Sequence, residues 1–265
     1  MIKPIFIKEL KSNYKMLLVL CAVITMYEVM VIYMYNPDLL KMMNYFVESM
    51  PELVGMMNMN GNITSLLSFI SNYLYGFLLL VLPLILIITI SVRLVCKYID
   101  NGSLAYYLNS KYTRKQIILN QFLVCVTLVL GLMLYSYVVI LISSQVLFPN
   151  ELDIFNYSVV HLGLVALQIF VLGLSFMISC IFNEASKAYT WIISITTGSL
   201  LIQMLSGIGD SFSWLNNFSF HVLFDTQGLS ALNDVAIFKS IFLLVIGVVF
   251  AIYGMNHFIK KDLPL

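Results

Sequence analysis

Few residues in this chain have side chains able to do chemistry, and they stand apart from one another. Glu28 is the only acidic residue well inside an apolar run. A carboxyl group within hydrocarbon is costly, so Glu28 is a functional candidate by default, able to carry a proton or bind a cationic group. It could also hydrogen-bond Tyr or Gln side chains of neighbouring helices, or lie solvated near the outer interface. The sequence leaves the structural and functional roles of Glu28 open.

Neither metal binding nor covalent catalysis is indicated. The three histidines, His161, His221 and His257, lie in separate regions without the spacing of metal ligands. No GxSxG or HExxH motif occurs, and the four cysteines form no CxxC pair. We therefore expect no catalytic residue, no metal site and no cofactor bound by this chain.

The elements that must position Glu28 are long apolar segments. The chain is 61% hydrophobic and 10% charged, with a mean hydropathy of +0.95, whereas soluble domains carry roughly 25% charged residues. Several apolar runs approach the ~20 residues that cross ~30 Å of hydrocarbon. The sequence predicts an all-α integral membrane protein with six transmembrane helices, at about 16–35, 73–94, 122–147, 157–182, 189–206 and 240–258.

Basic residues fall on alternate connections between these segments. Of the 14 lysines and arginines, 12 lie on the N-terminus, the second and fourth connections and the C-terminus, and the other two are Lys41 and Lys239. Positive charge accumulates on the cytoplasmic side of membrane proteins. The split therefore predicts that both termini are cytoplasmic, in a protein that crosses the inner or plasma membrane several times.

Two flanking segments have patterns of their own within what we expect to be one transmembrane domain, residues 1–265. Residues 1–15 place apolar side chains near one helical face and lysines on another, which favours an amphipathic helix lying in the cytoplasmic interface. A charged flank that only sets topology is the alternative. Residues 207–239 are rich in aromatic side chains, which predicts short helices in an external or re-entrant loop.

The second connection, residues 97–115, is the most informative stretch. Asp100 and Ser103 offer helix N-caps. Leu104, Tyr107 and Leu108 then follow at i, i+3 and i+4, which predicts an apolar face on a very short cytoplasmic helix. Such a face needs a partner; packing against the ends of the chain's own spans is the alternative.

This stretch resembles the signature of the type-2 family of ATP-binding-cassette (ABC) transporter permeases. That family carries, after its second span, an acidic residue, a Gly-Ser/Thr-Leu step, a Leu-Ser or similar pair and a basic residue, in this order. The matching residues are Asp100, Gly102, Ser103, Leu104, Leu108, Ser110, Arg114 and Ile117. The chain departs from the pattern at Asn101, where a basic residue is common, and at Lys111-Tyr112, where a proline is frequent. Six spans, a basic amphipathic start and a long fifth connection are also similar to that family.

The resemblance implies the membrane half of an exporter. Two permease subunits, as a homodimer or heterodimer, would each dock onto one of two ATPase subunits. This chain has no G-x-x-x-x-G-K-[ST] loop, so ATP and Mg²⁺ would be held by the partner. Docking would involve Asp100, Gly102, Ser103, Leu104, Tyr107, Leu108 and Arg114.

The expected partners are thus the ABC ATPase, a second permease and the lipid bilayer, with no nucleic acid. Many aromatic and methionine residues suit an apolar or amphipathic cargo such as a peptide, antibiotic or lipid. Alternatives are an ion-coupled secondary transporter, for which Glu28 is the only support, and a non-transporting immunity or scaffold protein. An intramembrane enzyme would need clustered polar residues within spans, which the sequence lacks.

Overall fold

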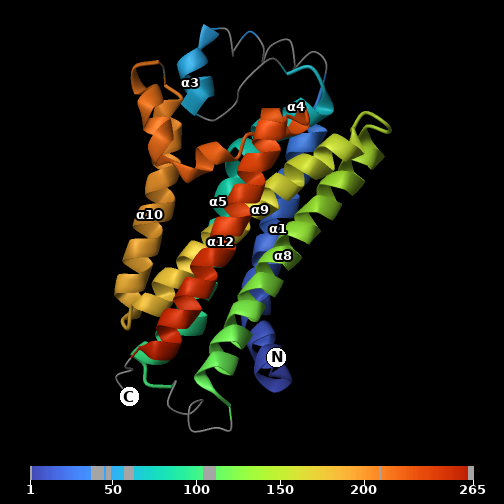
Figure 1. The fold of residues 1–265 in the computed structure, drawn as a ribbon. Coiled ribbons are helices and arrows are strands. Elements are labelled where there is room, and N and C mark those ends of the chain that lie inside the picture. The colour runs from blue at the N-terminus through green and yellow to red at the C-terminus, as the bar shows by residue number, and fades with distance from the viewer. Residues whose placement is uncertain are drawn as a thin grey trace.

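The computed structural model describes residues 2–36, 45, 49–56, 63–103, 112–208 and 210–261. Every regular element in these ranges is helical. Six helices are long and apolar enough to cross a membrane, and they lie side by side along a shared direction (Figure 1). The chain is therefore a helical, multi-pass membrane protein, as the apolar runs predict.

Five of the six spans are single α-helices: α1 (Lys3–Tyr33), α8 (Arg114–Leu147), α9 (Ile154–Ile181), α10 (Ala185–Ser206) and α12 (Asp234–Lys260). The second span, Leu66–Asp100, is a chain of five helical segments: α4 (Leu66–Ile70), η1 (Ser71–Leu78), α5 (Leu79–Ser91), η2 (Val92–Cys96) and α6 (Lys97–Asp100). Helix α1 begins and helix α12 ends at the same end of the bundle, where both chain ends lie (Figure 1). We call this the terminal end.

Every span begins three or more residues earlier than its apolar run, and at four of the six starts a polar side chain caps the helix. Before α8, the Thr113 hydroxyl accepts a hydrogen bond from Gln116 N, and Thr113 N donates to Gln116 Oε1, over 3.3 and 3.0 Å. This capping box satisfies backbone groups that have no partner within the helix. The side chain of Asn233 likewise caps α12. The six spans, of 22 to 35 residues, are therefore longer than the ~20 residues that cross the hydrocarbon.

Helix α9 is the centre of the bundle and packs on α5, α8, α10 and α12. Its closest neighbour is α12, where Gly247 lies against the α9 backbone: a Cβ added at Gly247 would stand 2.6 Å from Phe170 Cα. Small residues let transmembrane helices approach in this way. Gly247 and Ala251, four positions apart, thus form a packing surface of small residues, and Ala251 is fully buried.

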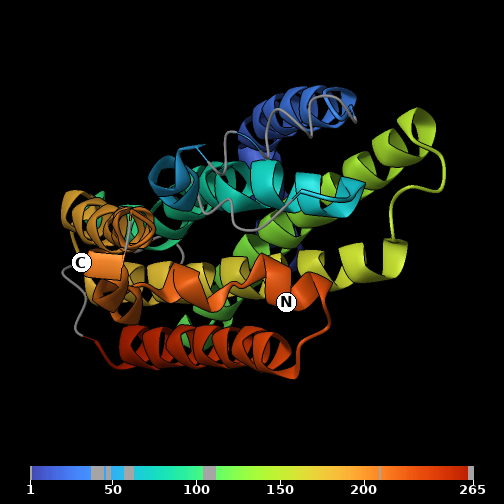
Figure 2. The same cartoon turned by 90° about the horizontal axis from the view of Figure 1, so that it is seen from above.

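The other tight pair is α1 with α8; viewed from above, α1 and α12 lie on opposite sides of the bundle (Figure 2). The buried residues of α1 form one stripe, with spacings of mostly four: Glu9, Asn13, Leu20, Ile24, Glu28 and Ile32. The stripe runs unbroken through residues 1–15 into the first span. The segment expected to lie as a separate amphipathic helix is therefore continuous with α1 and buries Glu9 against the bundle.

The second span is irregular, and a side chain from α9 compensates for it. Segments η1 and η2 are π-helical, and Pro83 lies inside α5. Proline has no N–H, so it cannot donate to the carbonyl of Leu79 four residues earlier. The Gln168 amide donates to that carbonyl instead, over 3.1 Å, and Gln168 is buried. Gln168 thus links α9 to the second span.

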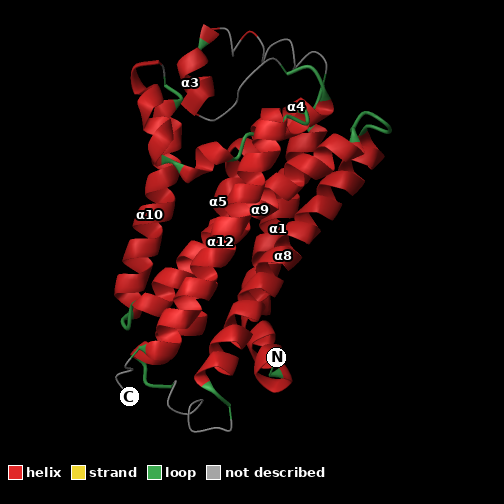
Figure 3. Cartoon of the chain, in the orientation of Figure 1, coloured by secondary structure: helices red, strands yellow, loops and turns green. Residues whose placement is uncertain are grey.

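The connection from α10 to α12 folds back into the bundle instead of extending away from it. It contains η3 (Asp210–Phe218), η4 (Phe220–Leu223) and α11 (Thr226–Ser230), the short helices that its aromatic residues predict, joined by brief loops (Figure 3). The Ser219 hydroxyl donates to the carbonyl of Ser199, about two turns below the end of α10, over 2.8 Å. A further short helix, α3 (Pro51–Met56), lies at this end of α10.

Candidate functional site

The second span ends at the residues that carry the permease resemblance. Gly102 has φ +68°, in the left-handed region that glycine adopts at little cost. Its N–H donates to the carbonyl of Ile99 over 3.0 Å, which is the usual way to close a helix C-terminus. The Ser103 hydroxyl then donates to Asn101 Oδ1 over 2.6 Å. Gly102 and Ser103 therefore form a defined exit from the span at the terminal end.

Asp100 joins this exit to the fifth span. Its Oδ2 accepts a hydrogen bond from Ala185 N, the first residue of α10, over 3.3 Å. A carboxylate at a helix N-terminus satisfies a free N–H and complements the helix dipole. The sequence suggested that Asp100 caps a helix of its own loop, and that helix lies outside the described residues. Within them, Asp100 is the last residue of α6 and caps the start of α10.

A groove opens where these two helices meet. It has a volume of about 680 Å³, and its lining residues come from the end of the second span and the first turns of α10: Lys97, Asp100, Ala185, Ser186, Tyr189, Thr190, Ile193 and Ser194. Ser186, Thr190 and Ser194 recur every four residues and are exposed. The groove thus presents a row of hydroxyl groups beside apolar side chains at the terminal end, next to the loop exit.

The predicted docking face itself cannot be placed. Leu104, Tyr107 and Leu108 lie outside the residues that the structure describes. Their role in docking a partner stays a prediction. What the structure gives is the anchoring of the loop on both sides, at Ser103 before it and at Thr113 after it.

Arg114 is occupied within the chain. As the first residue of α8, it donates from Nη1 to the carbonyl of Lys261 over 3.0 Å. The Lys261 ammonium in turn donates to the carbonyls of Cys180 and Ile181 at the end of α9, over 3.0 and 2.8 Å. Cations favour helix C-termini. The docking role that the resemblance implies for Arg114 stays a prediction, and within the chain its contact helps join α8, α9 and α12.

Glu28 is buried between α1 and α8. Its Oε1 accepts a hydrogen bond from the Ser136 hydroxyl, and its Oε2 has no hydrogen-bond partner among the described residues. Its exposed fraction is 0%, so the interpretation that Glu28 lies solvated near an interface is wrong. The interhelical alternative holds, although the partner is a serine and not the Tyr or Gln expected.

A second polar cluster, which the sequence did not reveal, joins η1, α8 and α9 at the level of Ser136. The Tyr75 hydroxyl is 2.7 Å from His161 Nδ1, and His161 Nε2 is 3.0 Å from the carbonyl of Met133. The rings of Tyr137 and Tyr157 stack beside them at 5.1 Å. Tyr75 stands in the π-helical segment η1, where such irregularities often mark functional sites. The available signal was a lone histidine within an apolar run.

No catalytic or metal-binding constellation emerges among the described residues. No group of three or more His, Cys, Asp or Glu side chains could hold an ion there. The four cysteines are free, and Cys96, Cys125 and Cys180 are buried. The arrangement can join helices and present surfaces to partners.

Comparison with protein-family models, with curated proteins and with solved structures finds no match to this chain. The class of protein defined by its fold is a multi-pass helical membrane protein.

Proposed function

We propose that this chain is the membrane-spanning permease subunit of an ABC exporter, driven by ATP that a separate ATPase hydrolyses. The terminal end is the cytoplasmic side in this proposal, in the cell's inner or plasma membrane. The 12 basic residues assigned to that side by sequence support this orientation. Two such subunits, as a homodimer or heterodimer, pair side by side within the membrane.

The observation that carries the proposal is the bond from Asp100 to Ala185 N. It couples the loop with the permease-like residues to the start of α10. A partner that moved the loop on binding or releasing ATP would therefore move the fifth span as well. Binding energy can shift a conformation only through contacts that differ between states, and this contact is placed to transmit such a difference.

The exposed face of α10 supports transport along that helix. Ser186, Thr190, Ser194 and Thr197 lie on one face and are exposed. A row of hydroxyl groups is unfavourable on a face toward lipid, whereas a face toward a second subunit or a water-filled path can hydrogen-bond it. Apolar neighbours such as Trp191 and Ile195 are exposed beside it, so the combined surface suits an amphipathic cargo, such as a peptide, an antibiotic or a lipid.

The test uses the loop residues. Leu104→Asp combined with Tyr107→Asp should leave membrane insertion intact and abolish association with an ABC ATPase, because two charges replace the apolar face. The matched control is Leu232→Asp with Val235→Asp, two exposed residues at the opposite end of the bundle. Both forms are purified from native membranes and bound proteins are identified by mass spectrometry. Equal ATPase recovery from both would contradict the docking assignment.

An ion-coupled transporter is the second candidate, favoured by one observation. Glu28 is fully buried and, among the described residues, keeps one carboxylate oxygen without a hydrogen-bond partner. An acid within the membrane is a feature of such transporters. Transport by vesicles that depends on a proton gradient and persists without ATP would favour this candidate over the ABC permease.

A further inference from the structure

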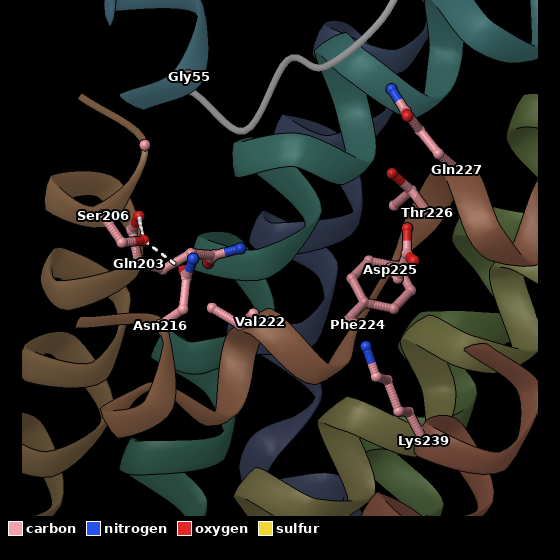
Figure 4. Close-up of a pocket in the computed structure, with 11 residues that line it drawn as sticks. Gly55, Gln203, Ser206, Asn216, Val222, Phe224, Asp225, Thr226, Gln227 and Lys239 are labelled. Atoms are coloured by element: carbon pink, nitrogen blue, oxygen red, sulfur yellow. Dashed lines mark hydrogen bonds between the residues drawn. The ribbon is translucent and has the colours of Figure 1, made fainter. Parts of the chain in front are cut away.

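A polar pocket lies at the end of the bundle opposite the terminal end. Its volume is about 360 Å³, at the lower end of the ~300–1,000 Å³ typical of small-molecule sites. Figure 4 shows side chains of α10 and η3, among them Gln203 and Asn216, on one side, and residues 225–227 on another. Lys239 of α12 points toward them from below.

The pocket brings together two opposite charges that do not neutralise each other. Asp225 and Lys239 both line the pocket. Within the described part of the chain neither forms an ion pair; the pair found there joins Lys187 and Glu184. Asp225 Oδ1 accepts a hydrogen bond from Gly228 N over 2.9 Å, which caps α11. Its other oxygen, Oδ2, accepts no hydrogen bond from the described residues.

Contacts within the chain join the elements around the pocket. Phe224, which precedes Asp225 and is 2% exposed, packs with its ring centroid 6.5 Å from that of Tyr75. Ser206 donates to Asn216 Oδ1 over 2.6 Å on the far wall. Lys239 stands in the second turn of α12, near one end of a helix able to span the membrane.

We propose that this pocket binds a zwitterionic headgroup, with Lys239 contacting a phosphate or carboxylate and Asp225 contacting an ammonium a few bonds away. Phosphoethanolamine has this chemistry. It occurs free in solution and as the headgroup of an aminophospholipid, and the pocket lies at the end of the spans, where headgroups reside. A single ligand of this kind satisfies both charges at once, which neither a simple anion nor a simple cation can do. The inference holds whether or not an ATPase binds at the other end.

The test measures binding to the purified full chain in dodecyl maltoside. The probes are dihexanoyl-phosphatidylethanolamine, dihexanoyl-phosphatidylglycerol, which lacks the ammonium, and free phosphoethanolamine. Lys239→Gln and Asp225→Asn should each weaken binding of the ethanolamine lipid about tenfold, as expected for losing one charged contact. Asparagine keeps the N-cap of α11, so the second variant removes charge without removing the helix start.

Matched controls separate the pocket from general charge effects. Asp234→Asn changes an exposed acid at the start of α12, and Lys260→Gln changes an exposed lysine at the far end of that helix. Both should bind the ethanolamine lipid as the unaltered chain does. Elution of every variant as a single species at the same volume confirms that it is folded.

Each outcome supports or overturns the inference. Selective weakening by the two pocket variants supports it. Competition by free phosphoethanolamine then identifies a soluble zwitterion, and a requirement for acyl chains identifies a lipid; both support the shared chemistry. Unchanged affinity in Lys239→Gln and Asp225→Asn overturns it, as does binding of the glycerol lipid equal to that of the ethanolamine lipid.

Discussion

The carboxylate of Asp100 and the backbone N–H of Ala185 are joined across the end of two spans, 3.3 Å apart. The residues are 85 positions apart in sequence, and the bond links the exit of the second span to the first turn of the fifth. The end of the second span is thereby joined to the start of α10.

Replacing Asp100 tests whether this bond holds α10. Asp100→Ala should lower the free energy of unfolding by about 1 kcal/mol, the usual cost of losing a helix cap, and Asp100→Asn should lower it less because asparagine also accepts the bond. Thermal unfolding in detergent measures this, with an expected drop in Tm of roughly 2–4 °C for alanine. Equal Tm values for the alanine variant and the unaltered chain would contradict the link.

The contact between α9 and α12 gives a second prediction. Gly247→Ala should destabilise the chain by about 1–3 kcal/mol, because its Cβ would meet the backbone of Phe170 at 2.6 Å. Gly198→Ala in α10 is the matched control, since nothing lies within 4 Å of a Cβ there, and it should be neutral or slightly stabilising. The comparison is made by thermal unfolding; a smaller loss at Gly247 than at Gly198 would show that the helices do not approach as described.

The pairing of Gln168 with Leu79 can be tested by a double-mutant cycle. Gln168→Leu should cost about 1–3 kcal/mol, because the buried carbonyl of Leu79 loses its donor. In a Pro83→Ala background, a helical N–H becomes available for that carbonyl, so the same change should cost less. Denaturant unfolding of the four proteins measures the coupling, and strictly additive effects would refute it.

Glu28 distinguishes the two candidate functions. If ATP drives transport and Glu28 only ties α1 to α8, Glu28→Gln should retain transport, because the amide oxygen can still accept from Ser136. Glu184→Gln, at an exposed acid paired with Lys187, is the control. Uptake of cargo into vesicles is measured for both. Loss of transport in the first variant alone would favour ion coupling.

The spans were predictable because they depend on composition, whereas their ends were not. An apolar run of about 20 residues reports the part of a helix that lies in hydrocarbon. The eight residues from Arg114 to Gln121 lie before the predicted start of α8 at 122, because Thr113 and Gln116 set the start by hydrogen bonds. Polar caps carry no hydropathy signal.

Long-range partners explain what the sequence could not give at the candidate site. The bond from Arg114 to Lys261 joins residues 147 positions apart, and no local pattern encodes it. The burial of Glu9 was within reach, because Glu9, Asn13, Leu20, Ile24 and Glu28 follow helical spacing on one face. The stripe becomes visible only when residues 1–15 and the first span form one helix, as they do in α1.

The central claim is that this chain works with a separate ABC ATPase, and affinity purification from native membranes in mild detergent tests it most directly. The proposal predicts that an ATPase with a G-x-x-x-x-G-K-[ST] loop is recovered with the chain, in a ratio of one to one if two ATPase subunits serve two permease subunits. Recovery of the chain intact and free of any such ATPase would contradict the proposal.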